Sequence, residues 1–148
     1  TAADGPFLQD LKDKIARHGL ADAVEFQPDF DKPARRAFLK DVDVLSVPAP
    51  KGEAFGAFML EAMAEGVPVV EPAVGGFPEV IKATGGGVTY DPVEDDGLER
   101  ALAKLLLDRE QARKLGARGR ETVHCDYTVD RMAERLETVY ARLAGEKN

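Results

Sequence analysis

The chain has 148 residues, of which 44% are hydrophobic and 32% charged, and its formal net charge is -7. This composition predicts one folded domain with a real core, and the acidic balance argues against a nucleic-acid-binding surface or partner. One cysteine, Cys125, excludes an internal disulfide and fits a cytosolic setting, and two isolated histidines do not suggest a metal site. No apolar run approaches the roughly 20 residues needed to span a bilayer.

Helical segments alternate with short apolar strands along the chain. The helical spacing of Leu8, Leu11 and Ile15 predicts the first helix, and Asp31 is a predicted N-cap for the second. In chain order, helices are predicted at about 8–18, 31–40, 56–65, 78–83, 97–107, 110–123 and 129–143, and strands at 24–27, 42–47, 67–70 and 88–90. This alternation predicts an α/β fold with a mostly parallel sheet.

Two acids, Glu53 and Glu61, are the most informative residues of the chain. Gly56 marks the change from loop to helix, so Glu53 lies in the loop and Glu61 lies one to two turns inside the helix. A rise of 1.5 Å per residue separates them by about 10 Å. Because Glu61 lies in an almost wholly apolar run, its carboxylate needs a basic group, a backbone donor or a ligand hydroxyl.

The predicted helix N-terminus lies between these two acids, and helix N-termini attract phosphate. The loop that carries Glu53 follows the strand at 42–47, and ligands of parallel sheets bind at the carboxyl ends of strands. The layout of acid, anion site and acid suits a ligand with hydroxyls at both ends and a diphosphate in the middle. A nucleotide-sugar is such a ligand.

Simpler structural explanations exist for each residue taken alone. Glu53 is then an exposed loop acid, and Glu61 a core acid that an arginine satisfies. Gly75 and Gly76 form a tight turn, and Glu79 stabilises the N-terminus of its helix. Core packing accounts for the neighbouring apolar residues Phe55, Phe58, Leu60 and Met63.

The segment EAFGAFMLE at 53–61 resembles the E-x7-E signature of retaining GT-B glycosyltransferases of the group 1 (family 4) class. The flanking segments resemble that family in the expected order. They are VEFQ at 24–27, DVLSVP at 43–48, EAMAEGVPVV at 61–70, GGFPE at 75–79 and DYT at 126–128. The resemblance covers essentially the whole chain. One departure is Glu71, which stands where the family usually has a small or neutral residue.

The resemblance implies a role for each acid. Glu53 would contact the donor sugar and stabilise charge at the anomeric centre, and Glu61 would hydrogen-bond the ribose hydroxyls of the nucleotide. Phe30 would lie near the base. The backbone N–H groups that would face the sugar and diphosphate are those around Ala54, Phe55, Gly56 and Ala57. No metal or other cofactor is implied, because cationic side chains and a helix N-terminus handle the diphosphate in the family.

The resemblance also implies that residues 1–148 form a partial C-terminal, nucleotide-sugar-binding half, truncated at the N-terminus. This half is a Rossmann-like parallel sheet flanked by helices, with its first two strands missing and a closing helix at about 129–143. The strand at 24–27 would then lack a partner. The missing strands would also carry the family's Arg/Lys pair for the diphosphate, which Lys51 replaces poorly.

The expected function is transfer of a sugar from a nucleotide-sugar donor to an acceptor hydroxyl with retention of configuration. The chain alone, without its acceptor-binding N-terminal half, is expected to be inactive. Two alternatives stay open: a related GT-B enzyme such as a nucleotide-sugar epimerase, and a non-catalytic nucleotide-sugar-binding or assembly module. The expected location is cytoplasmic, with peripheral association at the inner face of the membrane only through absent segments.

Overall fold

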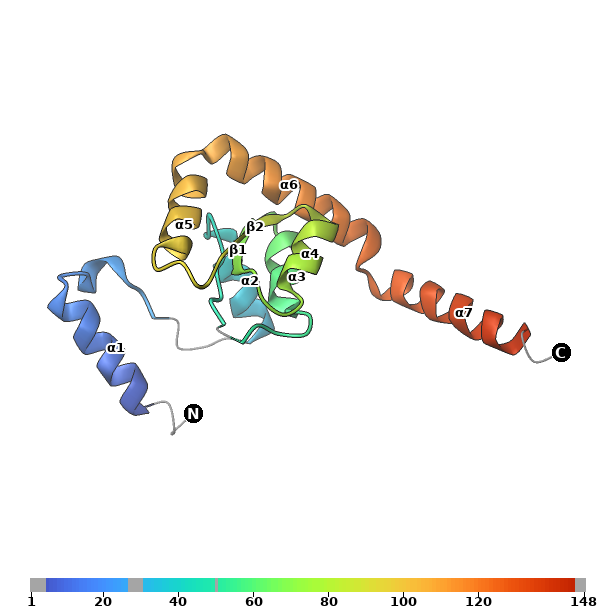
Figure 1. The fold of residues 1–148 in the computed structure, drawn as a ribbon, viewed down its shortest axis with the longest axis horizontal. Helices are drawn as coiled ribbons and strands as arrows, with labels where there is room; N and C mark the ends of the chain where they lie inside the picture. Colours follow the sequence, from blue (N-terminus) through green and yellow to red (C-terminus); the bar gives the residue numbers. More distant parts are fainter. Residues whose placement is uncertain (1–4, 27–30, 50, 146–148) are drawn as a thin grey trace. The chain divides into compact units, whose positions relative to one another are not determined.

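The computed structural model describes residues 5–26, 31–49 and 51–145 and divides the chain into two compact units, residues 1–34 and 35–148 (Figure 1). The first unit contains helix α1 (Gly5–Arg17) and the short 3₁₀ helix η2 (Ala21–Ala23). The Nζ atom of Lys12 lies 5.3 Å from the centroid of the Phe26 ring. The predicted first helix is confirmed, with its start three residues earlier.

The predicted strand at 24–27 is wrong for the three residues that the structure describes. Val24 has extended backbone angles, with φ of -124° and ψ of 120°. Within the described residues, however, no strand pairs with 24–26, so these N–H and C=O groups form no ladder. Gln27 and Phe30 lie outside the described residues.

Helix α2 (Lys32–Lys40) begins where the sequence predicts it. The Asp31 carboxylate accepts a hydrogen bond of 2.9 Å from the N–H of Ala34, which lies three residues later in the first turn of the helix. This contact is the usual one between an N-cap side chain and the first turn. The predicted cap is therefore confirmed, and the boundary between the two units falls within this helix.

The second unit contains a small parallel sheet. Strand β1 (Val69–Pro72) pairs with β2 (Gly87–Tyr90) in parallel register, and Leu45 adds one parallel bridge to Val69. The prediction of a parallel sheet is confirmed, but the strand predicted at 42–47 is reduced to this bridge. Pro72 has no N–H with which to extend the ladder, and the Val47 N–H donates to a side chain instead.

Helices cover both faces of this sheet (Figure 1). Neighbouring strand residues point to opposite faces: Val69 packs in the cluster that contains Met59 and Phe77, whereas Val70 packs with Leu105. The helices of this unit are α3 (Ala57–Ala64), α4 (Phe77–Thr84), α5 (Gly97–Leu107), α6 (Arg109–Asp126) and α7 (Val129–Gly145). All five were predicted, with shifts of a few residues at their ends.

Helix α7 differs from the other helices of its unit. None of its described residues, Val129–Gly145, is buried. Its apolar residues recur at helical spacing and leave about half or more of their surface exposed, and they are Val129, Met132, Leu136, Val139, Tyr140 and Leu143. In the part of the chain that the structure describes, no helix is long and apolar enough to cross a membrane.

Candidate functional site

The loop that carries Glu53 lies directly against the turn at Gly75 and Gly76. The N–H of Gly76 donates a hydrogen bond of 2.8 Å to the carbonyl oxygen of Glu53. A Cβ atom on Gly76 would lie 2.2 Å from the carbonyl oxygen of Ala54, and one on Gly52 would lie 2.9 Å from the Gly75 nitrogen. Only glycine fits at these positions, so the two motifs form one backbone assembly.

Gly56 converts this loop into helix α3. It is the N-cap residue, with φ of 71°, and its carbonyl oxygen accepts a hydrogen bond of 2.9 Å from the N–H of Met59. A Cβ atom here would lie 3.0 Å from the Phe77 ring in addition to the strain of positive φ. The predicted change from loop to helix at Gly56 is confirmed.

The predicted site residues therefore occupy one continuous segment of loop and helix. Glu53, Ala54, Phe55 and Ala57 are exposed, whereas Gly56 is buried. The first two N–H groups of α3 have no acceptor within the helix. The segment thus combines an exposed acid with the N-terminus of a helix, and the individual roles assigned to these residues stay predictions.

Glu61 forms an ion pair with Arg35 of α2. The Arg35 Nε atom lies 2.9 Å from Glu61 Oε2, and the two side chains are 33% and 42% exposed, respectively. An arginine therefore satisfies this acid, as the simpler explanation of Glu61 requires. Because the carboxylate is still partly exposed, the ion pair also leaves it within reach of a ligand. The sequence offers no spacing rule that would identify Arg35 as the partner.

A second ion pair ties α2 to the end of α3. The Arg36 Nε atom lies 2.7 Å from Glu65 Oε1. Glu65 is the C-cap residue of α3, one turn beyond Glu61. Adjacent arginines of α2 thus hold two acids of α3 in register, although each exposed pair adds little stability by itself.

Glu71 of β1 is fully buried, with 0% of its surface exposed. Its two carboxylate oxygens lie 3.1 and 3.2 Å from the Val47 nitrogen, whose N–H donates to them. The pKa of Glu71 is raised to about 8: burial raises it most, the Val47 N–H opposes this by lowering it, and the negative charge of Glu53 adds to the rise. Burial and the Glu71 carboxylate together raise the pKa of Tyr90.

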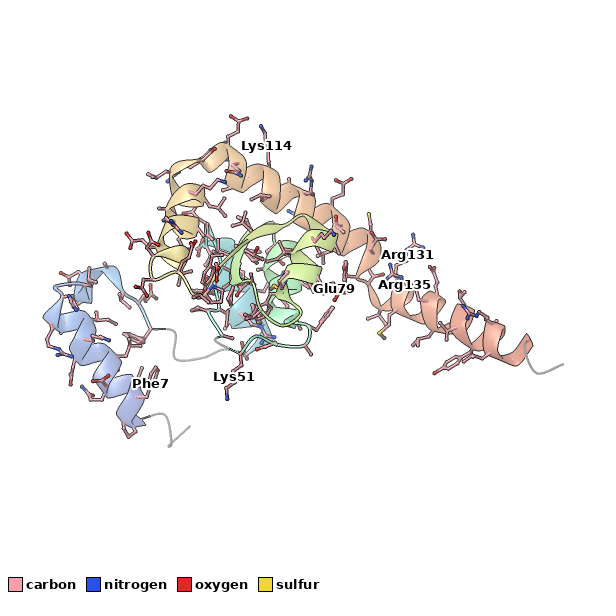
Figure 2. The ribbon with its side chains drawn as sticks, viewed as in Figure 1. Phe7, Lys51, Glu79, Lys114, Arg131 and Arg135 are labelled. Carbon is pink, nitrogen blue, oxygen red and sulfur yellow. The ribbon has the colours of Figure 1, made fainter. Side chains whose placement is uncertain are left out.

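Two other residues considered from the sequence lie at the surface. Lys51 is exposed and projects outward from the loop (Figure 2). Glu79 is exposed in the first turn of α4, where a negative charge favours the helix N-terminus. Within the residues described, no three His, Cys, Asp or Glu side chains gather as a metal site. The expectation of a metal-free site stays a prediction.

The sequence profile described as "Glycosyl transferases group 1" matches residues 2–122. The chain belongs to this glycosyltransferase family. The predicted family is thus confirmed. The glycosyltransferase signature EAFGAFMLE lies within the matched residues, and so do the loop and the turn that the glycines hold together.

Curated glycosyltransferases resemble the chain over most of its length. It is 35% identical to the "GDP-mannose-dependent alpha-(1-6)-phosphatidylinositol monomannoside mannosyltransferase" of Mycobacterium tuberculosis, over 89% of this chain and 36% of that protein. It is 31% identical to the "N-acetyl-alpha-D-glucosaminyl L-malate synthase" of Bacillus anthracis, over 93% of this chain and 35% of that protein. The chain spans about a third of the length of these two relatives.

Solved structures of GT-B glycosyltransferases contain the fold of this chain as one part. Sucrose-phosphate synthase from Thermosynechococcus elongatus superposes with a TM-score of 0.79 and 28% identity, over 94% of this chain and 35% of that one. HepE from Anabaena, in complex with UDP, gives a TM-score of 0.82 at 20% identity, over 95% of this chain and 38% of that one. The predicted α/β fold class is confirmed.

Proposed function

We propose that the chain is the donor-binding part of an enzyme that transfers a sugar from a nucleotide-sugar to an acceptor hydroxyl with retention of configuration. The observation that carries this proposal is the contact between the Glu53 loop and the turn at Gly75 and Gly76. This contact brings the family's acidic motif and its glycine turn together at the carboxyl end of β1. Ligands of parallel α/β sheets bind at that end of the strands.

The two acids would then bind opposite ends of the donor. Glu53, on the exposed loop, would contact the sugar and stabilise positive charge that develops at the anomeric carbon. Glu61 would accept hydrogen bonds from the ribose hydroxyls, and Arg35 would hold its carboxylate in place. The backbone N–H groups around Ala54, Phe55, Gly56 and Ala57 would face the sugar and the diphosphate.

The remaining parts of the proposal concern the whole enzyme. A second, acceptor-binding half of the same protein would complete the cleft, and this chain alone would have little or no activity. No metal would be required, since backbone donors and basic residues would stabilise the leaving diphosphate. We also propose a cytoplasmic location, with any association with the inner face of the membrane made by segments outside this chain.

The donor is proposed as a class, a nucleoside diphosphate sugar. A curated relative is named for GDP-mannose, and the Anabaena protein HepE was crystallised with UDP-glucose. The nucleotide-sugars in these two names carry different bases. A site built from backbone N–H groups and carboxylates would bind the diphosphate and hydroxyls that such donors share, and the base and sugar are left to measurement.

Titration with UDP-, GDP- and ADP-sugars tests the proposal. The longest natural protein that carries this sequence is used, with binding followed by calorimetry. Glu61→Ala is expected to weaken donor binding by at least about tenfold, the usual cost of losing a hydrogen bond to a charged group. Glu65→Ala is the matched control, because Glu65 lies on the same helix and pairs with Arg36 but lies one turn farther along.

The outcomes separate the proposed function from its alternatives. Donor binding followed by sugar transfer, with the anomeric configuration retained in the product by NMR, supports the retaining transferase. Conversion of the donor sugar to its epimer in the absence of an acceptor indicates an epimerase. Binding of a donor without any turnover indicates a non-catalytic nucleotide-sugar-binding module. Absence of binding to every donor indicates an assembly module and overturns the proposal.

A further inference from the structure

Glu71 is a buried acid that the proposed donor chemistry does not use. It is fully buried on strand β1, and among the described residues no lysine or arginine forms an ion pair with it. Burying a carboxylate without a cation is costly unless the group is hydrogen-bonded or protonated. The contacts of Glu71 in the fold must therefore explain why an acid is tolerated at this buried position.

Glu71 lies on the face of the sheet that helix α3 covers, close enough to Glu53 for the two charges to interact. Residues two apart on a strand point to the same face, so Glu71 shares the face of Val69, which packs in the cluster of Met59 and Phe77. The α3 side of the sheet is therefore the side on which its carboxyl group lies. The effect of the Glu53 charge on the pKa of Glu71 agrees with this placement.

Among the described residues, one group donates a hydrogen bond to Glu71, the N–H of Val47. Val47 follows Leu45, which forms the bridge to β1, and precedes the loop that carries Glu53. The Val47 N–H would continue the ladder with β1, but Pro72 has no N–H to return the next bond. The Glu71 carboxyl group instead accepts the hydrogen bond of the Val47 N–H, with one of its oxygens 3.1 Å from the Val47 nitrogen. From Val47 the chain leaves the sheet for the loop that carries Glu53.

We propose that Glu71 is a positioning residue of the donor site that holds Val47, and with it the start of the Glu53 loop, and does so as a neutral acid when an anionic donor is bound. This inference rests on the proposed function, because it takes the diphosphate of a nucleotide-sugar as the anion. Glu71 acts through Val47 and does not touch the reacting atoms.

Proton linkage follows from the charges around Glu71. Among the described residues, the titratable groups that interact with it are Glu53 from the loop, which is acidic, and Tyr90 from β2, whose raised pKa keeps it neutral near pH 8. A bound diphosphate adds further negative charge, and like charges favour the protonated carboxyl. Donor binding should therefore take up a proton wherever free Glu71 is ionised, and affinity should fall as the pH rises past about 8.

The test compares donor affinity across pH in the longest natural protein that carries this sequence. Calorimetry with whichever of the UDP-, GDP- and ADP-sugars binds is run from about pH 6 to about pH 9, in buffers of different ionisation enthalpy, so that proton uptake is measured directly. The variants are Glu71→Gln, Glu71→Leu and the control Glu79→Gln, an exposed acid on α4. Any protonation change of the donor itself affects wild type and variants equally, so it does not contribute to the difference between them.

The expected results differ for each variant. Wild type and Glu79→Gln lose affinity above pH 8 by up to about tenfold per pH unit and take up a proton on binding. Glu71→Gln keeps neutral-pH affinity within about twofold and loses both the alkaline decline and the proton uptake. Glu71→Leu binds more weakly at every pH, because it leaves the Val47 N–H unpaired.

Two results would overturn the role of Glu71 and leave the proposed function intact. They are an alkaline decline in Glu71→Gln equal to that of wild type, and wild-type affinity in a folded Glu71→Leu. Circular dichroism and thermal unfolding establish that each variant is folded. A wild-type protein that binds none of the three donors at any pH would instead overturn the proposed function, and this inference with it.

Discussion

Arg35 and Glu61 join helix α2 to helix α3 through an ion pair of 2.9 Å, at the acid proposed to bind the donor ribose. The pair reconciles two explanations of Glu61 that the sequence leaves as alternatives. An arginine satisfies the acid structurally, and the partial exposure of both side chains keeps the carboxylate accessible. The same contact can therefore hold the acid in the absence of ligand and orient it when ligand is bound.

Arg35→Ala is expected to weaken donor binding by about three- to tenfold, because Glu61 loses the group that orients it. The free energy of unfolding should change by less than about 1 kcal/mol, since the pair is partly exposed. Calorimetry and urea unfolding measure the two quantities. Arg36→Ala, which removes the neighbouring pair with Glu65, is the control and should leave affinity unchanged. Equal losses in the two variants would contradict a specific role for Arg35.

Gly76→Ala is expected to displace the Glu53 loop. Its Cβ atom would lie 2.2 Å from the carbonyl oxygen of Ala54, which is backbone and cannot move alone. We expect a loss of about 1–3 kcal/mol of stability and of at least about tenfold in donor affinity. Gly5→Ala is the control, because a Cβ atom there would meet nothing within 4 Å. Unchanged binding by Gly76→Ala would show that the contact with the turn does not shape the site.

Glu53→Gln is expected to lower the rate of sugar transfer far more than donor affinity. The proposed role of Glu53 is to stabilise charge that develops at the anomeric carbon, and removing one such group costs about 10²–10³ in kcat. Initial rates at saturating donor, together with calorimetry on the longest natural protein that carries this sequence, separate the two effects. Glu99→Gln, an exposed acid on α5, is the control. A wild-type kcat in Glu53→Gln would remove Glu53 from the catalytic step.

The buried acid makes the stability of the fold depend on pH. The folded-state pKa of Glu71 is about 8, against a value of 4.5 for the unperturbed group. Between these values the unfolded chain loses this proton first, so the contribution of Glu71 is full below pH 4.5 and declines as the pH rises toward 8. The whole decline is at most about 5 kcal/mol, at about 1.4 kcal/mol per pKa unit.

Urea unfolding at pH 5 and pH 8 measures this dependence. Wild type is expected to be less stable at pH 8 than at pH 5, and Glu71→Gln should remove most of the difference, because glutamine has no proton to lose. Glu79→Gln serves as the control for a change of surface charge. If Glu71→Gln loses as much stability as wild type between the two pH values, another group must carry the dependence.

The features of the fold that could be predicted from the sequence are those that depend on residues close together in the chain. Asp31 caps α2 and Gly56 starts α3, because a side-chain cap and a positive φ each leave a clear signal in residue type. The parallel sheet follows from the alternation of helices and strands. The loop and the turn of the candidate site could also be located in advance, since their motifs are contiguous.

What the sequence could not supply depends on contacts between distant residues. Arg35 and Glu61 are separated by most of α2 and by the whole segment up to α3, and no pattern pairs them. The strand at 42–47 has suitable residue types, but a strand forms only where a neighbour accepts and donates its bonds, and Pro72 ends that ladder. The burial of Glu71 is likewise set by tertiary packing, which no local pattern in the sequence shows.

Helix α7 has a thermodynamic consequence of its own. A helix of its length is marginal in water unless it is packed, and none of its residues from Val129 to Gly145 is buried. Its backbone amides should therefore exchange with deuterium nearly as fast as those of a free peptide, whereas the amides of β1 should be protected up to global unfolding. Helix α7 would then be ordered only where another surface covers its apolar residues. Slower deuterium exchange at individual amides of α7 would identify the residues that are covered.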